Sequence, residues 1–80
     1  LIAQGRSALF EGDTVLAREY LSRVKNLNPT MPEINLFEAE ILLKEGQRDA
    51  AKKLLSDLAA DLGIADWIRK LADEYLLQMQ

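Results

Sequence analysis

Hydrophobic side chains recur every three or four residues along nearly the whole chain, which is the spacing of one face of an α-helix. Three such stripes consist of Leu16, Ala17, Tyr20, Leu21, Val24 and Leu27, then Ala51, Leu54, Leu55, Leu58 and Leu62, then Ile64, Trp67, Ile68, Leu71, Tyr75 and Met79. No segment alternates between apolar and polar residues with the period of two that a half-buried strand requires. The pattern therefore predicts an all-α chain.

Glycine residues divide this pattern into helices. Gly12 ends the first predicted helix, and the carboxylate of Asp13 can accept hydrogen bonds from the free N–H groups that begin the second. Gly46 ends the third helix and Gly63 the fourth, so that five helices are predicted in all. Because the connections are short, about two to five residues, successive helices are expected to run antiparallel.

The third and last predicted helices differ in character. The third follows the stretch NPTMPE, where Thr30 and Glu33 are predicted to form a capping box and Pro32 lies in the first turn. This helix is apolar on nearly every side, which indicates that it packs against neighbours on more than one side. The last helix has one apolar stripe and a charged opposite face, as expected of a lid. Trp67 lies on that stripe and is predicted to be part of the core rather than a platform for stacking a ligand.

Residues 1–29 align with residues 35–63 when the chain is shifted by 34 positions. Identical or small residues coincide at Gly5 and Ala39, Leu9 and Leu43, Glu11 and Glu45, Gly12 and Gly46, Ala17 and Ala51, Leu21 and Leu55, and Ser22 and Ser56. A helix–turn–helix unit of this period, with small residues and turn glycines in register, resembles the tetratricopeptide repeat family. The small residues are expected at the helix crossings, with Gly5 at the close crossing of the first hairpin.

The resemblance implies a right-handed α-solenoid of antiparallel helix hairpins. We expect a single domain with one repeat at 1–29, a second at 32–63, and a C-terminal capping helix at 64–79. The last segment also fits the first helix of a degenerate third repeat. We expect the chain to be a fragment of a longer protein. The first hairpin has no preceding cap, so Leu1 and Ile2 are expected to be exposed there.

Composition removes several classes of chemistry. The chain has no Cys and no His, so disulfides, thiolate metal sites and histidine general bases are absent from it. Its paired acidic residues are interpreted as a solvated face, and no catalytic residue, metal site or cofactor is predicted. The net charge of −3 opposes binding to nucleic acid. No apolar run approaches the roughly 18 residues of a membrane span, so no membrane association is predicted.

What remains is binding through shape, to a protein or peptide. In the family that the chain resembles, the first helices of successive repeats line a concave groove. Carried over, the groove positions are Ile2, Arg6, Leu9, Phe10, Glu33, Leu36, Glu40, Leu43 and Lys44. We interpret Phe10, Leu36 and Leu43 as surplus apolar residues that face a partner, although Phe10, Leu9 and Leu43 also fit ordinary packing between helices. The positions of the clamp that holds a C-terminal carboxylate in chaperone-binding members are occupied by Ile2, Arg6 and Phe37, so that clamp is not expected.

Three functional hypotheses follow. The first is a non-enzymatic scaffold module that binds a peptide or a partner helix in the groove. The second is homotypic assembly, in which the N-terminal hairpin or the groove pairs with a second copy to form a homodimer. The third is a regulatory lobe of a larger enzyme or transcription regulator.

Overall fold

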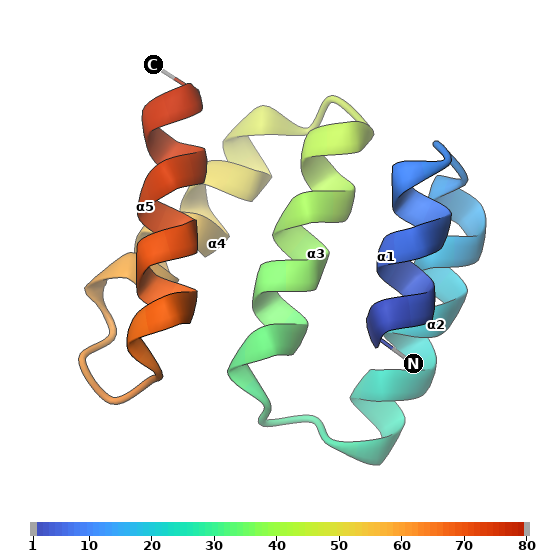
Figure 1. Ribbon diagram of the computed structural model, residues 1–80, viewed down its shortest axis with the longest axis horizontal. Coiled ribbons are helices and arrows are strands. Elements are labelled where there is room, and N and C mark those ends of the chain that lie inside the picture. Colours follow the sequence, from blue (N-terminus) through green and yellow to red (C-terminus); the bar gives the residue numbers. More distant parts are fainter. Residues whose placement is uncertain (1, 80) are drawn as a thin grey trace.

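The computed structural model describes residues 2–79, which form five α-helices and no strand. The helices are α1 (Ile2–Phe10), α2 (Thr14–Leu27), α3 (Pro32–Lys44), α4 (Arg48–Ala60) and α5 (Asp66–Gln78). α1 and α2 form one hairpin, α3 and α4 form a second, and α5 packs against α4 and α3 at the end of the molecule opposite the first hairpin (Figure 1). The predicted all-α solenoid of helix hairpins is confirmed. None of the helices formed by residues 2–79 is long and apolar enough to cross a membrane.

The two hairpins turn in the same way. Gly12 and Gly46 have φ angles of +86° and +81°, in the left-handed region that glycine adopts without strain. The N–H of Asp13 donates to the carbonyl of Ala8 at 2.9 Å, and the bond from Gln47 to the carbonyl of Leu42 is its counterpart at 2.8 Å. This pairing satisfies carbonyls that the helix end would otherwise leave free. The structural repeat thus includes the turn backbone as well as the side chains.

Two of the predicted helix ends differ from the structure. Asp13 caps α2 as predicted, since its Oδ1 accepts from the N–H of Leu16 at 3.0 Å. The predicted capping box at Thr30 is wrong, because α3 begins at Pro32 with Met31 as its N-cap and no side-chain cap bond. α4 ends at Ala60 rather than at Gly63, and Gly63 lies in the following turn.

α3 is the centre of the fold and contributes to two apolar clusters. The first cluster lies between α1, α2 and α3 and contains Ala8, Leu9, Ala17, Leu21, Val24, Ile34, Phe37 and Ile41. The second lies between α3, α4 and α5 and contains Leu36, Ala39, Leu55, Leu58, Ile68 and Ala72. Phe37 and Leu36 are neighbours in sequence but face opposite clusters, and both are 0% exposed. The nearly continuous apolar character of this helix is therefore explained by its burial on two sides.

Several residues at the edges of the predicted stripes are exposed. Leu27 ends α2 and is 71% exposed, Leu62 lies in the turn after α4 and is 82% exposed, and Leu16 is also exposed. The prediction that Trp67 belongs to the core is wrong, because its side chain is 48% exposed. Consecutive residues of a helix point about 100° apart, so the inward direction of Ile68 carries Trp67 away from the core.

The backbone at Gly5 packs closely against the aromatic ring of Phe37 in the second hairpin. A Cβ atom at Gly5 would lie 2.3 Å from Cζ of Phe37 and 3.2 Å from Cβ of Tyr20. The sequence predicted a close crossing within the first hairpin, with α2. The tightest neighbour is instead Phe37 of α3, so the missing side chain of Gly5 makes room for the contact between the two hairpins.

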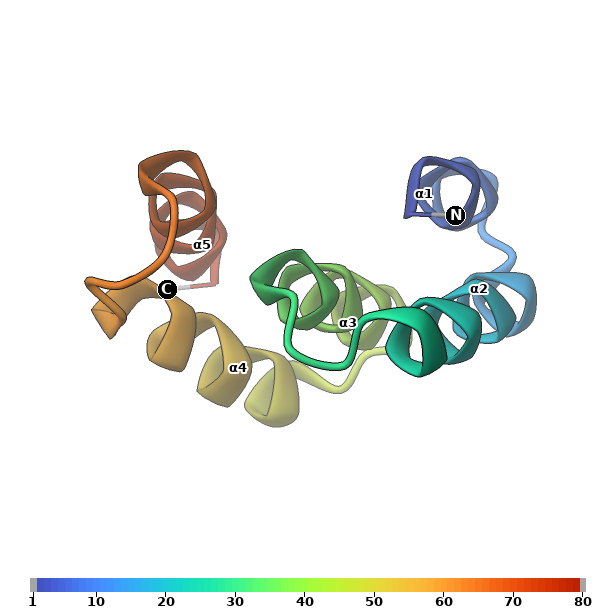
Figure 2. The same cartoon turned by 90° about the horizontal axis from the view of Figure 1, so that it is seen from below.

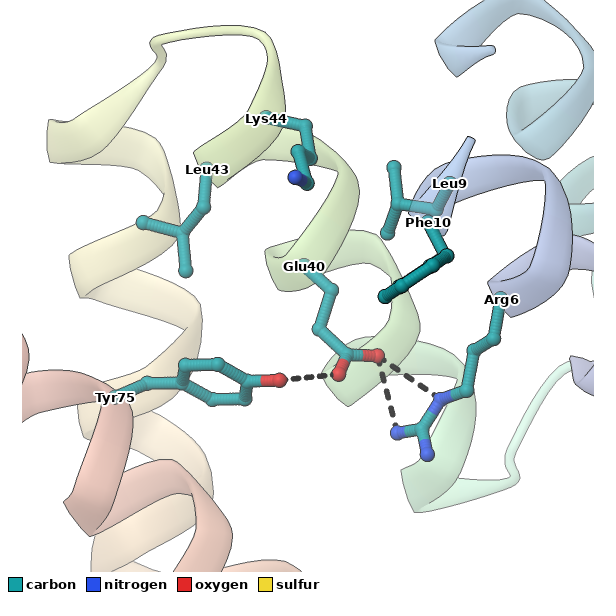
Figure 3. Close-up of a pocket in the computed structure, with 7 residues that line it drawn as sticks. All are labelled: Arg6, Leu9, Phe10, Glu40, Leu43, Lys44 and Tyr75. Atoms are coloured by element: carbon teal, nitrogen blue, oxygen red, sulfur yellow. Dashed lines mark hydrogen bonds and ion pairs between the residues drawn. The ribbon is translucent and has the colours of Figure 1, made fainter. Parts of the chain in front are cut away.

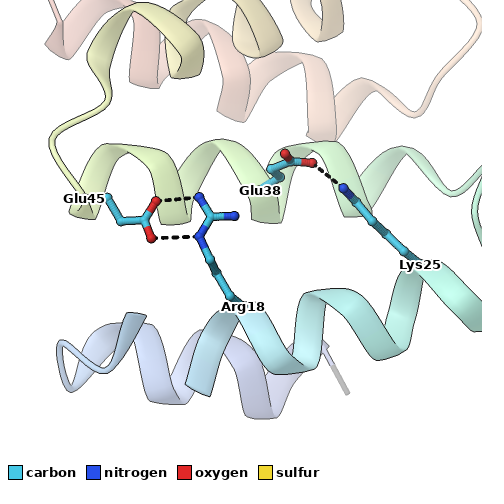
Figure 4. A network of polar contacts seen from close by, with 4 residues as sticks. All are labelled: Arg18, Lys25, Glu38 and Glu45. Carbon is cyan, nitrogen blue, oxygen red and sulfur yellow. Dashed lines mark hydrogen bonds and ion pairs between the residues drawn. The ribbon is translucent and has the colours of Figure 1, made fainter. Parts of the chain in front are cut away.

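Two ion pairs join α2 to the second hairpin, one at α3 and one at the residue that caps its C-terminal end (Figure 4). The guanidinium of Arg18 binds both carboxylate oxygens of Glu45, with 2.7 Å between Nε and Oε2, and Nζ of Lys25 lies 2.9 Å from Oε1 of Glu38. The hydrogen bond from Arg18 lowers the pKa of the Glu45 carboxyl, and the same bond raises the pKa of Arg18. These pairs link the hairpins without burying a charge.

Candidate partner-binding groove

α1 and α5 stand on the same side of α3, while α2 and α4 lie on the other side (Figure 2). A groove of about 310 Å³ lies between α1, α3 and α5. The residues that line it are Arg6, Leu9, Phe10, Glu40, Leu43, Lys44 and Tyr75 (Figure 3). α3 supplies the middle of the groove, and α1 and α5 supply its two sides.

The α1 and α3 residues of the groove are equivalent positions of the two repeats. They form three pairs, each 34 residues apart, namely Arg6 and Glu40, Leu9 and Leu43, and Phe10 and Lys44. Because the two helices have the same orientation in their hairpins, equivalent side chains face the same hollow. The structure thus brings together most of the predicted groove residues, and their binding of a partner stays a prediction.

Glu40 joins all three helices at the floor of the groove. Its Oε1 accepts from Nε of Arg6 at 3.1 Å and lies 3.0 Å from Nη2 of the same guanidinium. Its Oε2 accepts from the hydroxyl of Tyr75 at 2.5 Å (Figure 3). The side chain of Glu40 is only 11% exposed, and its two oxygens are satisfied by α1 on one side and by α5 on the other.

Tyr75 is held in its neutral form by this position. Burial raises the pKa of Tyr75 to about 12, and the hydrogen bond to Glu40 and the charge of that carboxylate act in the same direction. Loss of the phenolic proton would place a second negative charge against Glu40. Tyr75 is therefore a hydrogen-bond donor throughout the neutral range.

The part of the groove near the C-terminal ends of α1 and α3 is apolar and carries one cation. Leu9 is 6% exposed and belongs to the first cluster, whereas Phe10 next to it is 89% exposed. Leu43 is half-buried and packs against the second cluster. Lys44 lines the groove but forms no ion pair with a carboxylate of residues 2–79. Leu9 is thus ordinary packing between helices, and Phe10 is the surplus apolar residue.

Three of the predicted groove residues lie elsewhere. The interpretation of Leu36 as a surplus exposed residue is wrong, because it is wholly buried in the second cluster. Ile2 and Glu33 border a different hollow of about 500 Å³ at the end of the first hairpin. That hollow is lined by Ile2, Ala3, Val24, Leu27, Asn28, Met31 and Glu33. Ile2 is half-buried rather than exposed, and Leu1 lies outside the described residues.

Tyr75 is the groove residue that sequence reasoning missed, because it was assigned only to the apolar stripe of the last helix. One signal could have found it. A buried tyrosine usually finds a partner for its hydroxyl. The 34-residue period places Tyr75 opposite Ile41, next to Glu40 in α3. A tyrosine at that position can pack its ring inward and extend its hydroxyl to the neighbouring carboxylate.

The groove offers shape, one cation and an apolar wall rather than reactive groups. Within residues 2–79 there is no group of three or more Asp and Glu side chains placed to hold a metal ion. The acidic residue of the groove is fully engaged by Arg6 and Tyr75. The arrangement is suited to holding a side chain of a partner against Phe10 and Leu43.

Comparison with known proteins gives one match. A family model described as tetratricopeptide repeat matches residues 8–63, which span α2, α3 and α4 and the last turn of α1. No curated protein and no solved structure matches the chain.

Proposed function

The chain belongs to the tetratricopeptide repeat family, and on that premise we propose that it binds a peptide or partner helix in the groove between α1, α3 and α5. Tetratricopeptide repeats generally mediate protein–protein interaction, and the family typically serves as a non-enzymatic scaffold. We further propose that residues 1–80 act as one domain of a longer protein, with repeats at 1–29 and 32–63 and a cap at 64–79.

One observation carries the proposal, namely the exposure of Phe10 beside the groove. An aromatic side chain that is 89% exposed leaves its apolar surface in water. Phe10 and Leu43 both line a hollow that is open to solvent and large enough for a side chain. Interfaces concentrate their binding energy in a few aromatic and large apolar anchors, and a partner residue placed here would cover Phe10.

The titratable groups of the groove support a non-enzymatic role. A general acid or base works best when its pKa lies near the working pH. Tyr75 has a pKa of about 12 and donates to Glu40, so it is a poor proton carrier at neutral pH. Arg6 is paired with the same carboxylate.

A homodimer through the N-terminal hairpin is the second candidate. The second hollow favours it, because Leu27 is 71% exposed there beside the half-buried Ile2 and Met31. The outer face of α1 argues against a homodimer. On α3, Phe37 and Ile41 pack against the first hairpin, whereas the equivalent positions of α1 hold the small, exposed residues Ala3 and Ser7.

A regulatory lobe of a larger enzyme or transcription regulator is the third candidate, and it would use the groove between α1, α3 and α5.

A peptide selection tests the first candidate. The chain is used as bait for a random-peptide phage library, and selected peptides are synthesised and titrated by fluorescence anisotropy. Phe10→Ser is expected to weaken their binding by about tenfold or more, as removal of an anchor does. Val15→Ser is the matched control, since Val15 is 73% exposed but lies on α2, outside the groove.

Two results would overturn the groove assignment. One is a library that yields no binder, and the other is a set of binders equally affected by Phe10→Ser and Val15→Ser.

Light scattering over a range of concentrations tests the homodimer. A dimer that Ile2→Glu dissociates would make the N-terminal hairpin the interface, whereas a monomer at all concentrations would exclude it.

A further inference from the structure

We propose that the groove selects an acidic peptide segment, in which a carboxylate pairs with Lys44 and a nearby large apolar side chain packs on Phe10. This inference rests on the proposed function and names the chemical class of the partner. It follows from the charges that remain free once the internal bonds of the groove are made.

The charges at the floor are already balanced within the protein. Arg6 is bound to Glu40 through two nitrogen–oxygen contacts of 3.0 and 3.1 Å, and Tyr75 donates to the other oxygen. Glu40, whose side chain is only 11% exposed, is held against this guanidinium. Separating the two would leave a nearly buried carboxylate without its partner, which is costly. The charge of Arg6 is therefore already balanced by Glu40.

Lys44 is the cation that remains. Its side chain lines the groove, and its ammonium group lies toward the hollow near Leu9 and Leu43 (Figure 3). No carboxylate among residues 2–79 forms an ion pair with it. With Arg6 and Glu40 cancelling each other, the lining carries a net charge of +1, opposite in sign to the −3 of the whole chain. Charge complementarity at this point favours an acidic partner.

The apolar part of the site lies directly beside this cation. Phe10 and Lys44 are equivalent positions of α1 and α3 and line the same hollow, and Leu43 precedes Lys44 in α3. A ligand residue on Phe10 and a carboxylate on Lys44 are then neighbours on the peptide. This arrangement requires only one acidic side chain and one large apolar side chain, close in sequence.

A charge-reversal selection tests the inference. The random-peptide phage library is panned on the wild-type chain, on Lys44→Glu, and on the matched control Lys53→Glu, which makes the same charge change at an exposed position of α4 outside the groove. We expect Asp or Glu near Phe, Leu or Trp in peptides from the wild type and from Lys53→Glu, and Lys or Arg there in peptides from Lys44→Glu. Circular dichroism checks that each variant keeps its helices.

One synthetic wild-type binder then gives the size of the effect. Lys44→Glu is expected to weaken it by about tenfold, Lys53→Glu by much less, and a Glu→Lys change in the peptide is expected to restore binding to Lys44→Glu. Neutral or basic peptides that still depend on Phe10 would overturn the acidic preference and leave the groove assignment standing. Equal losses in the two lysine variants would also overturn it, because they indicate a general charge effect. Peptides that do not depend on Phe10 would overturn both proposals.

Discussion

α1 and α3 are equivalent helices of two hairpins, yet α3 is buried on both sides and α1 on one. Ala3 and Ser7 of α1 are exposed, whereas Phe37 and Ile41, 34 residues further along, are 0% exposed. The turns that follow the two helices have the same backbone and the same hydrogen bonds. The repeated small residues and glycines therefore determine the hairpin, while side-chain size at equivalent positions determines which helix packs against a neighbouring hairpin.

The same comparison explains the groove. Where α1 and α3 carry complementary residues at equivalent positions, as Arg6 and Glu40 do, the side chains bind each other and close the floor. Where they carry unlike residues that cannot pair, as Phe10 and Lys44 do, both are left to solvent or to a partner. Divergence between the repeats, rather than their likeness, thus creates the candidate site.

The largest expected effect comes from breaking the burial of α3. Phe37→Ala removes a ring that is 0% exposed, and we expect the free energy of unfolding to fall by about 3–5 kcal/mol. Ala3→Ser, a substitution at the equivalent position of α1, is expected to alter the free energy of unfolding by less than about 0.5 kcal/mol, as exposed substitutions do. Urea unfolding followed by circular dichroism measures both.

Since Phe37→Ala can unfold so small a domain, Phe37→Leu serves as a milder variant, with an expected loss of about 1–2 kcal/mol. Comparable losses at Ala3 and Phe37 would contradict the difference between the two helices.

The next effect concerns the gap left by Gly5. Gly5→Ala places a Cβ 2.3 Å from Cζ of Phe37, and overpacking of this kind costs about 1–3 kcal/mol. The better helix propensity of alanine offsets at most about 1 kcal/mol of that loss. We therefore expect net destabilisation in urea unfolding. In a Phe37→Leu background, the same Gly5→Ala change should become neutral or stabilising, and an unchanged penalty there would show that Phe37 is not its cause.

A smaller effect is expected at the link between α3 and α5. Tyr75→Phe removes the bond to Glu40, and we expect a loss of about 1 kcal/mol, below the usual value for a bond to a charged group because Tyr75 is only half-buried.

The same bond predicts a pH dependence. Because the pKa of Tyr75 is about 12 in the folded protein and about 10 in an unfolded chain, its contribution is complete below pH 10. The contribution is lost as the pH rises toward 12, since the unfolded chain gives up the proton first. Unfolding measured across this range should show a flatter decline for Tyr75→Phe than for the wild type, and identical slopes would contradict the bond. Glu40→Gln should lower the pKa of Tyr75 in an ultraviolet titration.

The smallest effect is expected at the seam between the hairpins. Arg18→Gln breaks the pair with Glu45, and Lys25→Gln breaks the pair with Glu38, each at a cost of about 0.5 kcal/mol. Raising the salt concentration should reduce the difference between each variant and the wild type. A salt-independent loss would show that packing of the side-chain stem, rather than charge, is responsible.

The sequence predicts most of the fold because the deciding signals are local. Gly12 and Gly46 mark turns that need a positive φ angle, and Asp13 has a side chain suited to an N-cap. The capping box at Thr30 failed for a local reason as well. Pro32 directly follows Met31 and fixes the first helical residue, so Met31 becomes the N-cap and Thr30 lies outside the helix.

The site is less predictable because it depends on contacts between distant helices. The 34-residue alignment correctly predicted that Arg6 and Phe10 lie in one groove with the equivalent α3 residues, Glu40 and Lys44. The alignment could not show that Leu36 faces α4 and α5 rather than the hollow, because a buried leucine and a groove-lining leucine look the same in the sequence. Tyr75 was missed because its role comes from a single long-range bond to Glu40.

The most direct test of the account is an NMR titration of the chain with a peptide selected from the random library, following each backbone amide. Binding in the groove predicts that the largest chemical-shift changes occur at Phe10, Leu43, Lys44 and Tyr75, with little change at Leu27 in the second hollow. Changes concentrated at Leu27 and its neighbours, or on α2 and α4, would contradict the assignment of the groove between α1, α3 and α5 as the partner site.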